Sequence, residues 1–222
     1  MGNVLDNLTA AEAAIAAGVT VSDVNRVIDR KILPGGLYST TDIRTVRKEA
    51  CLFIAFYYET AAWLTSTARL KAIRDSLVHD HSWLELKECK IEESRSVWIS
   101  WSHIWEDVDR RFKELEEACQ MVVEDPEILQ GTPVIRGTRI PVYDVASLVD
   151  SETPIAELFE LYPRLNCEQF ALASIYAKAN PQRGRPKRRR FPKGTLVSVS
   201  KFRLRDASLG GEICKKSLSM RT

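Results

Sequence analysis

The sequence predicts a mainly α-helical protein with small β-hairpins, with a helix-turn-helix at its N-terminal end and a winged helix-turn-helix-like module near its C-terminal end. Apolar residues recur every three or four positions through most of the chain, which is the period of an amphipathic helix. Gly137 lies between two short β-capable runs, and this predicts a hairpin because glycine tolerates a positive φ angle. The predicted regions are a helix-turn-helix with a helical core (1–80), a β-hairpin with a connecting helix (81–120), the winged module (121–180) and a basic tail (181–222).

The composition is ordinary for a globular protein, because 45% of the 222 residues are hydrophobic. The most apolar run, residues 50–64, is interrupted by Glu59 and is too short to span a bilayer. No signal peptide opens the chain, and the five cysteines are odd in number, far apart and without a Cys-x-x-Cys pair. We therefore expect a cytoplasmic protein with reduced thiols and no membrane partner.

Charge is divided unevenly along the chain, although the formal net charge is only +2. Residues 178–222 hold 14 Lys and Arg against two Asp and Glu, whereas residues 1–177 hold 18 against 28. A basic arm of this kind favours an acidic partner. The partner is a nucleic acid, an acidic surface of another protein, or the acidic body of the same chain.

Two short helices separated by a glycine turn are predicted near the N-terminus. A capping box at Thr9-Ala-Ala-Glu12 starts the first helix, and Gly18 ends it. The second helix begins near Thr20 or Ser22. This pattern fits a helix-turn-helix that reads DNA, and it also fits an ordinary helical hairpin.

The second of these helices has one apolar and one polar face. Its apolar residues follow the i, i+3 and i+4 spacing: Val24, Val27 and Ile28. The polar face carries four side chains that can donate hydrogen bonds to bases or phosphates: Ser22, Asn25, Arg26 and Arg30. These four residues are the candidate DNA contacts of the N-terminal module.

The middle of the chain is expected to supply much of the core. Residues 41–77 are compatible with a helix and rich in large apolar side chains, and the runs 83–91 and 97–101 are β-prone and predict a hairpin. The helix predicted over 102–120 has apolar residues at spacings of three and four: Trp105, Val108, Phe112, Leu115, Cys119 and Val122. Such a heptad seam either pairs two chains or packs one helix on its own domain.

Three short helices are predicted after the Gly137 hairpin. They cover residues 141–149, a segment capped by Thr153-Pro154, and residues 167–179, where Asn166 is the cap and Gln169 completes a capping box. A hairpin followed by three helices is the layout of a winged helix-turn-helix. Two arginines near the wing tip, Arg136 and Arg139, are candidates for contact with DNA phosphate or an acidic partner.

The third helix of this module is predicted to be a packing or partner surface, because its first turn carries Glu168. A carboxylate beside the first turn repels phosphate, although Gln169 next to it could in principle read adenine.

The residues between 112 and 186 resemble a known family. The run DPEILQGTPVIRGTRIPVYDVA is followed by ELFELYPRL, by ALASIYA and by an Arg-Gly-Arg-Pro sequence, in the order and spacing of the bacterial antitoxins built on the domain of unknown function numbered four-three-three. Members that also carry a helix-turn-helix are VapB-like. The resemblance implies an antitoxin that neutralises a PIN-type ribonuclease toxin and represses its own operon. It does not extend to residues 40–104 or 191–222.

The tail carries the candidate toxin-binding residues, Arg183, Arg185, Lys187, Arg188, Arg189 and Arg190. Its Arg-Gly-Arg-Pro core is similar to an AT-hook, which lies in the narrow minor groove of A·T tracts. The resemblance implies an alternative, in which an arginine enters the carboxylate cluster of a PIN-type active site and displaces Mg²⁺. A solvated tail without a partner fits the same composition.

The sequence does not predict an enzyme. It shows no nucleophile with a partner base, no phosphate-binding glycine loop and no paired catalytic carboxylates, and no cofactor is expected. His79 and His81 lack a third ligand at a recognisable spacing and are assigned to a solvated loop. We expect an antitoxin that binds operator DNA, as a homodimer or as a hetero-oligomer with its toxin. A DNA-binding regulator without a toxin is the main alternative, and an adaptor whose tail folds onto its own acidic body is the second.

Overall fold

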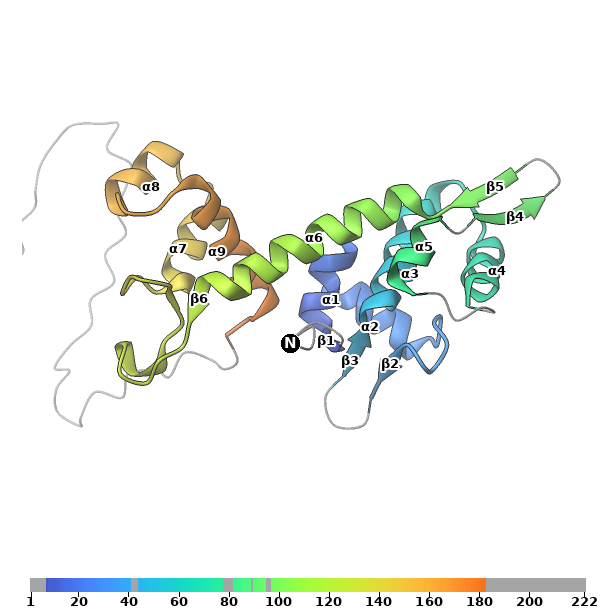
Figure 1. Cartoon of the computed structure of the whole chain (residues 1–222), viewed down its shortest axis with the longest axis horizontal. Coiled ribbons are helices and arrows are strands. Elements are labelled where there is room, and N and C mark those ends of the chain that lie inside the picture. Colours follow the sequence, from blue (N-terminus) through green and yellow to red (C-terminus); the bar gives the residue numbers. More distant parts are fainter. Residues whose placement is uncertain (1–6, 41–43, 78–81, 89, 95–96, 183–222) are drawn as a thin grey trace, which may run out of the picture. The chain divides into compact units, whose positions relative to one another are not determined.

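The computed structural model describes residues 7–40, 44–77, 82–88, 90–94 and 97–182, and these residues are mainly helical, with small antiparallel sheets (Figure 1). The helices are α1 (Ala10–Ala17), α2 (Val21–Asp29), α3 (Lys48–Glu59), α4 (Ser66–Ser76), α5 (Trp83–Glu88), α6 (Ser102–Met121), α7 (Val142–Asp150), α8 (Ile155–Leu161) and α9 (Cys167–Ala179), with single 3-10 turns at η1 (Thr60–Ala62) and η2 (Leu129–Gly131). The strands are β1 (Asn7–Thr9), β2 (Tyr38–Ser39), β3 (Thr45–Arg47), β4 (Lys90–Ser94), β5 (Val97–Ser100), β6 (Val122–Val123) and β7 (Val134–Ile135). The predicted fold class, mainly α with small β-hairpins, is confirmed at this level.

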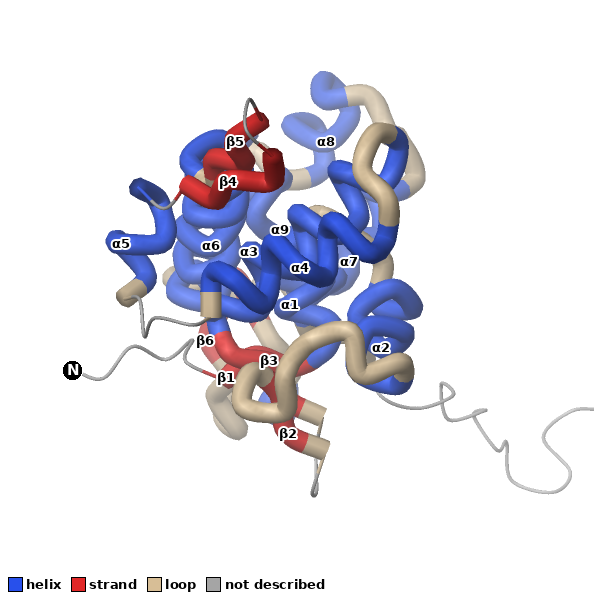
Figure 2. Tube along the Cα trace, turned by 90° about the vertical axis from the view of Figure 1, so that its right-hand side faces the viewer, coloured by secondary structure: helices blue, strands red, loops and turns tan. Residues whose placement is uncertain are grey.

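A small sheet joins the two ends of the N-terminal module. Its strand order is β1-β3-β2, and both pairs are antiparallel. Figure 2 shows the three strands next to one another. Leu8 of β1 lies opposite Val46 of β3, and both side chains are fully buried. This pairing brings the start of α1 next to the start of α3, a contact between segments nearly forty residues apart that the helical pattern could not predict.

Helices α1 and α2 begin and end where their capping residues dictate. The Thr9 hydroxyl accepts a hydrogen bond from the Glu12 N–H, and the Glu12 carboxylate accepts one from the Thr9 N–H, so the predicted capping box is present. Thr20 and Asp23 form the same reciprocal box at the start of α2. Gly18 ends α1 in the left-handed conformation, with φ at 67°.

The turn between these helices is packed closely against α6. A Cβ atom added to Gly18 would lie 2.8 Å from Cζ of Arg111, so the guanidinium rests directly on the turn. Glycine is therefore favoured here for two reasons, the positive φ and the close approach of a side chain.

Helix α6 supplies one face to the hydrophobic core. Trp105, Val108, Phe112 and Leu115 are buried in the cluster formed with α1, α2, α3 and β1, whereas Ala118 belongs to the cluster formed with α7, α8 and α9. The heptad seam is thus covered by this chain's own core. Of the two alternatives, packing within the domain is confirmed, and Phe112 and Leu115 are not available to a second chain.

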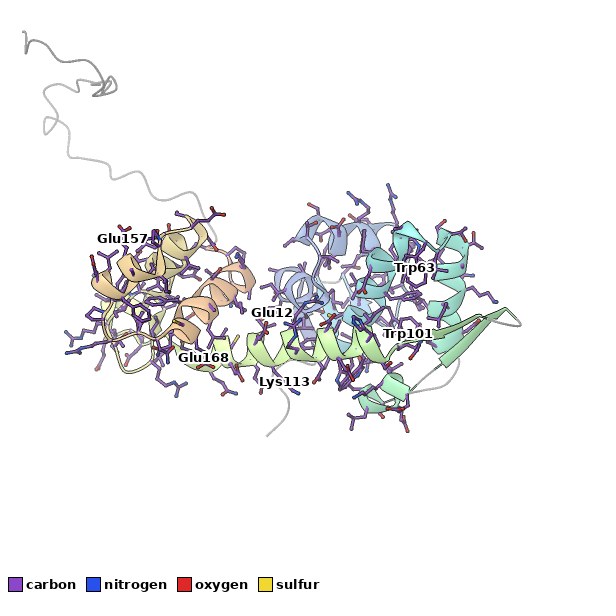
Figure 3. The ribbon with its side chains drawn as sticks, turned by 90° about the horizontal axis from the view of Figure 1, so that it is seen from above. Glu12, Trp63, Trp101, Lys113, Glu157 and Glu168 are labelled. Carbon is purple, nitrogen blue, oxygen red and sulfur yellow. The ribbon has the colours of Figure 1, made fainter. Side chains whose placement is uncertain are left out.

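Trp101, labelled in Figure 3, lies at the first turn of α6 and is fully buried. Its ring centroid is 4.5 Å from that of Phe56 and 5.4 Å from that of Phe53, both on α3. These aromatic contacts, each of a kind worth about 0.5–1.5 kcal/mol beyond area burial, hold α3 against the start of α6.

Two local predictions were wrong. Residues 83–88 form helix α5 and not a strand, because Ser82 and Glu85 make a capping box and the Trp83 ring packs against Trp105 and, edge-on, against Phe112. The side chain of Thr153 does not cap α8, whose N-cap is Pro154. The region 41–77, expected to be compatible with a helix, is helical in α3, η1 and α4, which follow strand β3, and Thr65 caps α4.

The C-terminal module contains the predicted turn and helices. Gly137 has φ at 74°, and the turn is closed by the hydrogen bond from the Ile135 N–H to the Ile140 carbonyl. The ladder itself runs between β7 and β6, with only an isolated bridge from Val134 to Pro141, so the expected hairpin is minimal. Helix α9 has the predicted bounds and the predicted Asn166–Gln169 capping box.

The Gly18 turn generates a test of the fold. Gly18→Ala should lower the free energy of unfolding by about 1–2 kcal/mol, because an L-residue is strained at this φ; the flexible Arg111 side chain can move away, so the backbone conformation dominates the loss. The measurement is urea unfolding. Gly35→Ala is the matched control, since no atom lies within 4 Å of its added Cβ and its φ is not positive. Equal effects of the two substitutions would contradict the role assigned to Gly18.

Candidate nucleic-acid interface

The four predicted contacts of the N-terminal module lie on α2 or at its end, opposite its buried face. Val24, Val27 and Ile28 are buried against the core. Ser22, Arg26 and Arg30 are exposed and Asn25 is half-buried. The structure therefore brings the four predicted residues together on one accessible surface. We call this surface, with the exposed Asp29 included, the α2 face: Ser22, Asn25, Arg26, Asp29 and Arg30.

The start of α2 is held rigidly by Asp23. Its carboxylate accepts hydrogen bonds from the Thr20 hydroxyl at 2.7 Å and from Arg26 Nη1 at 3.0 Å. The hydrogen bond from the Thr20 hydroxyl lowers the pKa of Asp23 below its usual range. The Tyr58 hydroxyl of α3 donates to the Asp23 carbonyl at 3.2 Å, so the first turn of α2 is tied to the core as well.

Arg44 completes the α2 face from outside the helix, although no sequence pattern points to it. It directly precedes β3, and its guanidinium donates from Nη1 to Asn25 Oδ1 at 3.0 Å and from Nη2 to Asp29 Oδ1 at 2.8 Å. Helix periodicity could not reveal this residue, because it lies nineteen positions from Asn25 in the chain and approaches through the β2–β3 pair.

Arg136 and Arg139 lie on the C-terminal module, at the turn after β7, and both are exposed. The Arg136 Nε donates to the Gln120 carbonyl at 2.9 Å and its backbone N–H donates to the Met121 carbonyl at 2.7 Å, so this arginine caps the end of α6. Within the described part of the chain, Arg139 has no hydrogen-bond or ion-pair partner, and no contact joins either arginine to the α2 face.

An open hollow of about 610 Å³ lies beside Arg136. It is lined by Glu117, Gln120, Met121, Arg136, Glu168 and Leu172, and it carries both signs of charge on an apolar floor. Glu168, labelled in Figure 3, belongs to the first turn of α9. A surface with exposed carboxylates beside one arginine suits a protein partner better than the uniformly negative DNA backbone.

Helix α9 is the central helix of the C-terminal module. Phe170, Leu172, Ala173, Ser174, Tyr176 and Ala179 are buried, and the helix packs against α7, α6 and α1. The prediction that the third helix of the module is a packing surface is therefore confirmed. Its exposed residues are Cys167, Glu168, Ala171 and Lys178.

A cluster of three polar side chains holds α7 and α9 together. The Ser174 hydroxyl donates to Asp150 Oδ1 at 2.7 Å, and Lys178 Nζ lies 2.8 Å from that hydroxyl and 2.9 Å from the carboxylate. Burial opposes ionisation of Asp150, but the hydrogen bonds from Ser174 and Lys178 outweigh it and lower the pKa. The cluster ties the end of α7 to α9.

The described residues contain neither a cluster of metal ligands nor a helix that could cross a membrane. No group of three His, Cys, Asp or Glu side chains that could hold a metal ion is found among the residues that the structure describes. His79 and His81 lie outside them, as do the candidate toxin-binding residues Arg183, Arg185, Lys187, Arg188, Arg189 and Arg190. None of the described helices is both long and apolar enough to cross a membrane.

Two comparisons relate this chain to known proteins, one over the C-terminal module and one over most of the chain. The family described as "Protein of unknown function (DUF433)" matches residues 122–177, which include β6, β7, α7, α8 and nearly all of α9. The "Uncharacterized protein y4eO" of Sinorhizobium fredii (strain NBRC 101917 / NGR234) is 41% identical over 206 residues, covering 89% of this chain and 92% of that protein. No solved structure was found to match. The chain therefore belongs to the family of protein y4eO and contains a DUF433 domain at residues 122–177.

Proposed function

We propose that the chain is the antitoxin of a type II toxin–antitoxin system, which binds operator DNA to repress its own operon and neutralises a PIN-type ribonuclease toxin. The observation that carries the DNA-binding part is the α2 face. It is an accessible helix surface with donor side chains, presented across a three-residue turn from a buried α1. This is the arrangement in which a helix-turn-helix presents its recognition helix to the major groove.

The β2–β3 pair supports the same proposal. It follows α2 in the chain and reaches the α2 face through Arg44. A β-pair beside a recognition helix is the wing of a winged helix-turn-helix. We therefore assign the wing to the N-terminal module, in addition to the short turn around Gly137 that the sequence suggested.

The toxin-binding part rests on different features. The first is the DUF433 domain, which lies within the region that resembles the antitoxins. The other two are the hollow beside Arg136, which carries both signs of charge, and the basic sequence after residue 182. A stand-alone DNA-binding regulator shares the evidence of the α2 face and lacks this second activity. A neighbouring reading frame for a small ribonuclease with an acidic site, co-purified with this chain, separates the two functions.

Arginines of the α2 face should contribute differently to DNA affinity. Arg26→Ala should weaken binding to the DNA upstream of the chain's own reading frame by about 1–3 kcal/mol and relax base preference, since a base contact is lost and Asp23 becomes unpaired beside the DNA. Arg30→Ala should weaken binding to all duplexes alike and reduce the slope of log affinity against log salt by about 0.9, as for one lost phosphate contact. Fluorescence anisotropy at several salt concentrations measures both quantities.

Arg164→Ala provides the control for these two variants. Arg164 is an exposed arginine between α8 and α9, so its substitution removes the same charge away from the α2 face. It should leave DNA affinity unchanged. Wild-type affinity in both Arg26→Ala and Arg30→Ala would rule out DNA reading by α2.

The tail is expected to act mainly on the toxin. Changing Arg183 and Arg185 together to Glu should release ribonuclease activity in an RNA-cleavage assay with Mg²⁺, because two carboxylates would then face the carboxylates of the active site. Specific binding to upstream DNA should remain largely intact. The assay uses the product of the neighbouring reading frame, co-expressed with this chain.

The matched control reverses two charges further along the tail, Lys215→Glu with Lys216→Glu, and should leave the ribonuclease inhibited. If the Arg183 and Arg185 double variant inhibits as well as the wild type and instead shows a reduced salt dependence of DNA binding, the tail acts on DNA phosphate and the toxin assignment of these arginines is wrong.

A further inference from the structure

Arg44 joins the wing, which is the β2–β3 pair, to the α2 face through one hydrogen bond and one ion pair. Nη1 donates to Oδ1 of Asn25 at 3.0 Å and Nη2 pairs with Oδ1 of Asp29 at 2.8 Å. The two acceptors lie four residues apart on α2 and therefore on the same side of the helix. A planar guanidinium can reach both acceptors at once, whereas the single ammonium of a lysine has no such fork.

The chemistry of the guanidinium fixes the orientation of the Asn25 amide. A guanidinium only donates hydrogen bonds, so the atom of Asn25 that faces Arg44 must be the carbonyl oxygen. The amide –NH₂ group is then turned away from Arg44, and no acceptor for it is found among the described residues. Without Arg44, the amide could rotate and present either its oxygen or its nitrogen.

The second contact adjusts the charge of the same surface. Asp29 is exposed on the α2 face, where an unpaired carboxylate would repel phosphate. Arg44 neutralises it. The side chains of Arg44 and Asp29 remain 45% and 57% exposed, and an ion pair this accessible contributes little to folding. The arrangement therefore matters for what the surface binds more than for the stability of the fold.

We propose that Arg44 is a specificity-determining residue of the DNA interface: from the wing, it holds the Asn25 amide with its –NH₂ group toward the base edges of the major groove. The inference rests on the proposed DNA-binding function. The base that Asn25 reads then presents an acceptor edge there, such as N7 and O6 of guanine, N7 of adenine or O4 of thymine. Arg44 is a positioning residue, because it acts through Asn25.

The test is selection of binding sites from a randomised duplex library by the full chain, followed by affinity measurements on single-base variants of the enriched sequence. At the position read by Asn25, the wild type should discriminate among bases by about 2- to 10-fold, as for one neutral hydrogen bond. Asn25→Ala should lose that discrimination, and Arg44→Ala should lose it at the same position. Arg44→Lys should restore it only partly.

Two further variants separate positioning from a general loss of affinity. The double variant Asn25→Ala with Arg44→Ala should discriminate no worse at that position than Asn25→Ala alone, because both substitutions remove the same contact. Arg47→Ala is the matched control; Arg47 is a nearby exposed arginine whose side chain pairs with Glu49 and not with α2, and its loss should leave discrimination at every position unchanged.

The possible results are distinguishable. If Arg44→Ala binds more weakly but keeps the wild-type discrimination at the Asn25 position, Arg44 contacts only phosphate and this inference is wrong, while the proposed function stands. If the wild-type chain enriches no sequence, DNA reading by the α2 face is wrong and the inference falls with it. Loss of discrimination confined to the Asn25 position is the expected result.

Discussion

The buried face of α6 is the constraint on which the rest of the structure depends. Its tryptophan, valine, phenylalanine and leucine side chains complete the core around α1 and α3, and its last turns contribute to the core of the DUF433 domain. From the same helix, Arg111 reaches the Gly18 turn and fixes the junction of α1 and α2. Because the apolar residues of α2 must face this core, its polar residues have only one direction left, which is outward.

Sequence patterns predicted the elements whose signals are local. The capping boxes at Thr9 and Asn166, the left-handed Gly18 and the bounds of α9 follow from side chains within one turn of each other. The same reasoning could have found α5, since Ser82-Trp-Leu-Glu85 is also a capping box, but the aromatic and aliphatic residues there favoured a strand. The pairing of β1 with β3 and the approach of Arg44 depend on segments distant in the chain and could not be predicted.

Four cationic side chains lie on or next to the α2 face, and two of them are paired with carboxylates. Arg26 pairs with Asp23 and Arg44 pairs with Asp29, so Arg30 and the neighbouring Lys31 supply its basic excess. A surface of this kind suits recognition of base edges and provides limited attraction to phosphate. The strongly basic sequence lies at the other end of the chain, after residue 177. In the proposed function, base recognition is assigned to the α2 face and most of the positive charge to the tail, so substitutions in each part can be tested independently.

Hydrogen–deuterium exchange of the full chain, with and without duplex DNA from upstream of its reading frame, tests the proposed interface most directly. DNA should slow amide exchange in α2 and the residues that follow it, 21–31, and in the β2–β3 pair, at residues 38–39 and 45–47. It should leave α9 unchanged, because that helix packs against α1, α6 and α7 and is not part of the proposed interface. Slowed exchange confined to residues 122–177 or to the sequence after residue 182, with none in α2, would contradict DNA recognition by the N-terminal module.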